Sequence, residues 1–137
     1  MTNHQQSNEL PLSLSEVMAG FPSPADDFLE SSLDLNEYLV KNPPSTFLVR
    51  VSGESMTGAG IFPGDILVVD RSLTAGANMV IIAVVDGEMT VKRLMRGSDG
   101  WFLQADNRRY PPIKISGRSE LLVWGVVVAV VRRLERA

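Results

Sequence analysis

The chain has 137 residues, enough for one domain with a real core, and its 45% hydrophobic and 21% charged composition is typical of a globular protein. It has no cysteine and one histidine, His4, which excludes disulfides and thiolate chemistry and argues against a Ser-His-Asp triad or a histidine metal site. The net charge of −3 divides into −6 for residues 1–44 and +3 for residues 45–137. This predicts a solvated acidic arm, or an arm attracted to a basic body. We expect no metal and no cofactor.

No stretch is long and apolar enough to span a bilayer, since the longest, residues 121–131, is short and interrupted by Gly125. The polar start of the chain lacks the basic residues of a signal peptide, so we expect a cytoplasmic protein without membrane contact. No basic run indicates nucleic-acid binding, and Arg132, Arg133 and Arg136 are expected to form a solvated C-terminal face.

Residues 1 to about 25 show little periodicity and contain three prolines, which predicts a mobile arm. Within it, Ala19-Gly20 joins a very small side chain to a flexible successor, a pair that fits a narrow catalytic cleft but is also a common dipeptide. A helix is expected from about Asp34, its cap, to Lys41, where Asn42-Pro43-Pro44 stops it.

From Thr46 onward the pattern favours β structure, with Asp86-Gly87 as a strong hairpin signal. The expected strands are residues 47–51, 66–71, 80–85, 89–95, 101–105 and 121–132. The fold class predicted is mainly β, a compact and mostly antiparallel domain with a flexible N-terminal arm and one short helix. We expect residues 1–44 to form the arm and residues 45–137 the β-rich body.

A small-residue corner, residues 51–56, follows the first of these strands and leads into what we expect to be one helical turn. Ser55 at this corner has two interpretations. The default is a helix cap. The other is a displayed nucleophile, for which the backbone N–H groups around Glu54, Ser55 and Met56 are candidate oxyanion donors.

Without histidine or cysteine, a serine nucleophile needs a lysine base, because arginine stays protonated in proteins. Lys41 ends the predicted helix and Lys114 lies in a proline-flanked edge segment, whereas Lys92 stands among apolar neighbours in a strand. Burial would lower its pKa, as a Ser-Lys dyad requires. Alternatively, its stem covers the sheet while its ammonium stays in water. Ser55 with Lys92 is the one nucleophile–base pair that the composition supports. The aspartates are too scattered for a metal cage: Asp65, Asp70, Asp86 and Asp106.

Three blocks in order resemble the Ser-Lys autopeptidases of the LexA/UmuD group, which are peptidases of the S24 type. They are Ser52–Met56, Pro63-Gly64-Asp65 and Asp86–Leu94. The segment Gly20–Ala25 resembles the UmuD branch in particular, and the likeness extends to the last strand. One departure stands at the expected cleavage site, where this chain has the Ala-Gly of the repressors in place of the Cys-Gly of the best-known UmuD.

The resemblance implies a fold like the LexA C-terminal domain, with Ser55 as nucleophile, Lys92 as uncharged general base and Ala19-Gly20 as the bond cut. It also implies an SOS-response protein whose self-cleavage is stimulated by a RecA filament on single-stranded DNA. The shortened form would serve a UmuC-type Y-family DNA polymerase in translesion synthesis. We expect a homodimer without direct sequence-specific DNA binding.

Other interpretations are less compatible with the sequence. A LexA-type repressor needs a helix-turn-helix before the cleavage site, and nineteen residues cannot hold one. A type I signal peptidase normally has a membrane anchor. A non-catalytic module that binds or regulates a polymerase, with an idle Ser-Lys pair, remains as the alternative.

Overall fold

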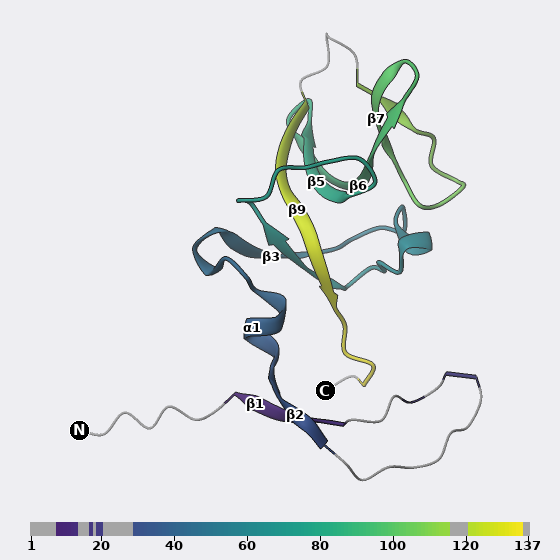
Figure 1. Cartoon of the computed structure of the whole chain (residues 1–137). Helices are drawn as coiled ribbons and strands as arrows, with labels where there is room; N and C mark the ends of the chain where they lie inside the picture. The colour runs from purple at the N-terminus through teal and green to yellow at the C-terminus, as the bar shows by residue number, and fades with distance from the viewer. Residues whose placement is uncertain (1–7, 14–16, 18, 21–28, 116–120, 136–137) are drawn as a thin grey trace. The chain divides into compact units, whose positions relative to one another are not determined.

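The computed structural model describes residues 8–13, 17, 19–20, 29–115 and 121–135 (Figure 1). The chain divides into two compact units, residues 1–41 and 42–137. No helix within the described residues is long and apolar enough to cross a membrane. The predicted mainly β fold is confirmed, with antiparallel pairing throughout the described sheets and one short α-helix.

The first unit contains a strand pair that the sequence did not predict. Strand β1 (Glu9–Ser13) pairs antiparallel with β2 (Leu29–Asp34), so the expectation of an arm without regular structure is wrong at residues 9–13. Helix α1 (Leu35–Leu39) is shorter than predicted, but its cap is confirmed, because the Asp34 carboxylate accepts from the N–H groups of Asn36 and Glu37.

The second unit is built on a seven-stranded sheet in the order β3-β4-β9-β5-β6-β7-β8. A 3₁₀ turn, Pro43–Ser45, precedes the sheet. The strands are β3 (Thr46–Arg50), β4 (Ile66–Asp70), β5 (Val80–Val85), β6 (Glu88–Gly97), β7 (Gly100–Gln104), β8 (Ile113–Lys114) and β9 (Leu121–Val131). The predicted Asp86-Gly87 hairpin is confirmed between β5 and β6, with both residues at positive φ, 49° and 83°.

Side chains of β5 separate the core into two clusters. Because neighbouring residues of a strand point to opposite faces, Ile82 packs with Met56 and Leu67, while Ile81 packs with residues of the second cluster. The second cluster contains Ala83, Leu94, Leu103 and Val126. Met56 is 1% exposed, so the chain immediately after Ser55 is anchored in the first cluster. Complete burial of such a side chain is worth about 1.5–3 kcal/mol.

Candidate active site

Ser55 lies on the corner between β3 and a short 3₁₀ helix, Thr57–Ala59, as the sequence predicted. Two backbone hydrogen bonds of 2.8 Å hold the end of β3, from Val51 N to Asp65 O and from Gly64 N to Val51 O. Gly53 makes the turn at φ +81°, a conformation that costs a residue with a Cβ extra energy. Met56 then fastens the far side of the corner to the core, so Ser55 is presented from a fixed loop.

The default interpretation of Ser55 as a helix cap does not describe its hydroxyl. The residue at the cap position of the 3₁₀ helix is Met56, and no side chain caps this helix. The Ser55 Oγ instead lies 3.0 Å from the Nζ of Lys92, thirty-seven residues further along the chain.

Lys92 reaches Ser55 from the middle of β6, where its backbone pairs with Ile81 of the central strand β5. Its Nζ also donates to Thr90 Oγ1 at 2.9 Å and to the Val91 carbonyl at 3.1 Å, so three oxygens orient it. The residue is only 7% exposed, which argues against a lysine whose ammonium stays in water.

Burial lowers the pKa of Lys92 below its ordinary value, because a desolvated ammonium is disfavoured. No carboxylate among the described residues forms an ion pair with it, so no anion offsets this effect. A neutral Lys92 amine can accept the Ser55 hydroxyl proton, which is what an activated serine requires.

The corner also presents backbone donors. Within the described part of the chain, the N–H groups of Glu54, Ser55 and Met56 have no acceptor. The side chains of the two flanking residues differ in position, since Met56 is buried and Glu54 is exposed. Glu54 and Met56 can therefore contribute to an oxyanion site beside Ser55 through their backbone N–H groups and not through their side chains.

Two cavities flank the Ser55–Lys92 contact. One of about 200 Å³ is lined by Ser55 and mostly by apolar side chains, among them Val49, Leu67 and Ile82. The other, of about 640 Å³, is lined by Lys92 and by Tyr110 and Pro111. Met89 and Thr90 line both cavities, so the two hollows adjoin at the strand that carries Lys92.

The expected cleavage site belongs to the other unit, residues 1–41. Ala19 and Gly20 are both exposed, and Gly20 has φ +120°. Most of the Gly20–Ala25 segment that resembles the UmuD branch lies outside the described residues.

Comparison with known proteins identifies the family. The Peptidase S24-like family matches residues 11–128. The chain belongs to this family. It is 40% identical over 121 residues to Protein MucA of Salmonella typhimurium and 42% identical over 124 residues to Protein ImpA of Escherichia coli. These alignments cover 88% and 90% of this chain and 82% and 83% of the relatives.

A further relative is LexA repressor 2 of Geobacter sulfurreducens, 36% identical over 135 residues, which are 98% of this chain and 65% of the repressor. The relatives therefore include UmuD-like proteins and a LexA repressor, which confirms the resemblance to the LexA/UmuD group that the motif residues indicated. As a Peptidase S24-like protein, the chain falls in the class of serine peptidases.

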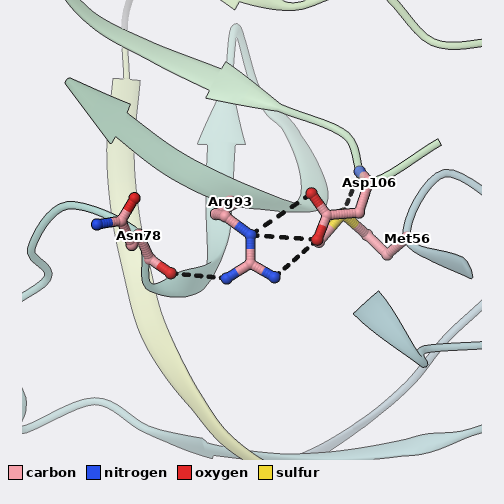
Figure 2. Close-up of polar contacts among 4 residues, drawn as sticks. All are labelled: Met56, Asn78, Arg93 and Asp106. Atoms are coloured by element: carbon pink, nitrogen blue, oxygen red, sulfur yellow. Dashed lines mark hydrogen bonds and ion pairs between the residues drawn. The ribbon is translucent and has the colours of Figure 1, made fainter. Parts of the chain in front are cut away.

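One ion pair close to the Ser55 corner was not predicted from the sequence. Arg93, next to Lys92 in β6, contacts the Asp106 carboxylate through Nη2 at 2.7 Å and Nε at 3.1 Å (Figure 2). The Asp106 backbone in turn contacts the residues after Ser55. No local sequence pattern predicts this pair, because Arg93 lies in β6 whereas Asp106 follows β7, thirteen residues further along the chain.

Arg132 is exposed, as expected, but its guanidinium also forms an ion pair that the sequence did not predict. Its guanidinium contacts both oxygens of Asp65 at 2.6 Å and donates to the Gly60 carbonyl, while the Asp65 side chain is only 1% exposed. The Arg132 hydrogen bond is the main reason that the pKa of Asp65 lies below its usual range. A buried carboxylate needs such a partner, which the sequence pattern did not reveal.

Proposed function

We propose that the chain is a self-cleaving serine peptidase in which Ser55 attacks the Ala19-Gly20 bond with neutral Lys92 as its general base. The observation that carries the proposal is the 3.0 Å contact between Ser55 Oγ and the Nζ of a lysine that is only 7% exposed. Residues 1–44 would be the arm that carries the bond, and residues 45–137 the catalytic body.

The reaction follows from these groups. Lys92 takes the Ser55 proton as Oγ bonds to the Ala19 carbonyl carbon, and a backbone N–H at the corner stabilises the resulting oxyanion. The C–N bond to Gly20 then breaks, and the Gly20 amine leaves with the proton from Lys92. A water molecule hydrolyses the acyl-serine in the same way, which releases the Ala19 carboxylate and restores Ser55. Thr90 Oγ1 and the Val91 carbonyl hold the Lys92 amine throughout.

The substrate is tethered to the catalyst, so the arm need not bind tightly. The arm carries a charge of −6 and the body a charge of +3, so electrostatic attraction further favours their encounter. We propose that this cleavage belongs to the SOS response, where a RecA filament on single-stranded DNA favours the pose with the arm in the cleft. The shortened chain would act, as a homodimer, with a UmuC-type polymerase. Relation to UmuD-like proteins supports this role.

The test is incubation of the full-length chain, with and without activated RecA filament, followed by intact-mass measurement. We expect loss of residues 1–19 and a new N-terminus at Gly20. Ser55→Ala and Lys92→Ala should each abolish cleavage while the fold is kept. Ser98→Ala and Lys114→Ala are matched controls, because both residues are exposed and lie outside the site, and they should cleave at the wild-type rate.

Normal cleavage in Ser55→Ala or Lys92→Ala would show that these residues are not the dyad. Cleavage at a different bond would show that Ala19-Gly20 is not the target. A wild-type chain that stays intact with activated filament, at any pH from 7 to 10, would favour the alternative of a non-catalytic module that binds or regulates a polymerase.

A further inference from the structure

The segment that follows β7, residues 105–107, holds the Ser55 corner on both sides. Before Ser55, the Asn107 Nδ2 donates to the Glu54 carbonyl at 2.8 Å. After Ser55, the Asp106 N–H lies 3.4 Å from the Met56 sulfur, and the Gly58 N–H donates to the Asp106 carbonyl at 2.6 Å. The corner is therefore held from a part of the chain about fifty residues away in sequence.

The Asn107 contact has a geometric consequence for the nucleophile. The Glu54 carbonyl and the Ser55 N–H belong to one peptide unit, which is planar and points its oxygen and hydrogen in opposite directions. Whatever fixes the carbonyl also fixes the direction of the N–H. A donor on the carbonyl further polarises the peptide and strengthens its N–H as a donor.

The amide of Asn107 is itself oriented. Its Oδ1 accepts from the Arg109 N–H at 3.0 Å, which turns Nδ2 toward Glu54. The preceding residue, Asp106, is anchored by Arg93, whose Nη1 also donates to the Asn78 carbonyl at 2.7 Å (Figure 2). Because Arg93 adjoins Lys92, the strand that carries the base also anchors the segment that holds the corner.

We propose that Asn107 is a positioning residue for self-cleavage, whose amide sets the direction of the Ser55 N–H so that this group binds the oxyanion. This inference rests on the proposed function, since it assigns a task to a residue beside the same nucleophile. Asn107 touches neither Ser55 Oγ nor Lys92 Nζ. Its Nδ2 lies 2.8 Å from the Glu54 carbonyl but 3.4 Å from Thr57 Oγ1, so we assign its effect to the shorter contact and hence to the Glu54–Ser55 peptide.

The test compares Asn107→Ala and Asn107→Leu with the wild-type chain in self-cleavage from pH 7 to 10. The first variant removes the amide and the second keeps its approximate size without a donor. Loss of a whole oxyanion donor lowers rates by about 100-fold to 1,000-fold. Here the donor is misdirected rather than removed, so we expect the plateau rate to fall by about 10-fold to 100-fold.

The pH at half-maximal rate should not change, because the groups around Lys92 are untouched. These include Thr90, and the charged residues Asp86 and Glu88 that line its cavity. Ser72→Ala is the control for a loss of stability alone, because it removes a 2.6 Å hydrogen bond to Asp70 away from the site. That control should cleave at the wild-type rate.

A second measurement does not depend on cleavage. In a Lys92→Ala background, the backbone ¹⁵N and ¹H resonances of Ser55 should shift on Asn107→Ala or Asn107→Leu and stay in place on Ser72→Ala. A plateau rate equal to the wild type, or a changed pH midpoint, would overturn the positioning role while leaving the dyad intact. So would an unmoved Ser55 amide resonance. Failure of the dyad itself would be seen separately, as cleavage by Ser55→Ala.

Discussion

Gly58 offers the sharpest test of how the corner is held. A Cβ added to Gly58 would lie 2.5 Å from the Asp106 carbonyl oxygen and 3.2 Å from its carbon, whereas ordinary contact begins at 3.4 Å. These are backbone atoms, so they cannot rotate away as a flexible side chain would. In Gly58→Ala the corner and the segment 105–107 must therefore move apart.

The cost can be worked out from this contact. The same Asp106 oxygen accepts the Gly58 N–H at 2.6 Å, so separation stretches a short hydrogen bond worth about 1 kcal/mol. Forcing an extra methyl into packed surroundings costs about 1–3 kcal/mol more. We expect a loss of about 2–4 kcal/mol in the free energy of unfolding, which at a slope of about 1–3 kcal/mol per molar urea lowers the unfolding midpoint by about 0.7–4 M.

The assay is urea unfolding in a Ser55→Ala background, so that self-cleavage does not alter the sample. Gly76→Ala is the matched control, since its Cβ would meet only the flexible end of Met79 at 3.8 Å. It should leave the midpoint nearly unchanged. Equal midpoints for Gly58→Ala and Gly76→Ala would refute the close approach of the two segments.

The remaining predictions concern titration. Because neutral Lys92 is the active form, self-cleavage should speed up, by at most about tenfold per pH unit, as pH rises through its lowered pKa; a flat rate in folded protein would contradict this. Folding also disfavours the charged form of Lys92, so the free energy of unfolding of the wild type should rise relative to that of Lys92→Met as pH approaches 10.5, the lysine pKa in the unfolded chain. Thermal melts at several pH values measure this difference. The Asp65 pKa is lowered by Arg132, so Arg132→Met should unfold at a higher pH on acidification than wild type, followed by circular dichroism, while exposed Arg133→Met should not.

Local features were predictable because the chain itself contains their cause. The Asp34 cap needs only N–H groups two and three residues away. The Asp86-Gly87 turn needs only two residues that tolerate positive φ. Strand β1 was not predicted, because Pro11 and its exposed apolar residues obscure a local strand pattern. It forms by pairing with β2, about twenty residues further along the chain.

Composition, with no cysteine and three lysines, left a serine and a lysine as the possible pair, and their positions in the predicted elements favoured Ser55 and Lys92. It could not decide whether the two side chains meet. That depends on the sheet order, which sets β6 beside the central β5 and buries Lys92 against the corner that leaves β3. Burial, which lowers the lysine pKa, is likewise a property of the packed fold.

The supporting contacts depend on tertiary structure even more strongly. Asn107 and Glu54 are fifty-three residues apart, and Arg132 and Asp65 are sixty-seven apart. An asparagine in a loop and an arginine near a chain end carry no local sign of such partners. Pairing across these separations is decided when strands distant in sequence become neighbours, because only then do desolvated polar groups have to find partners.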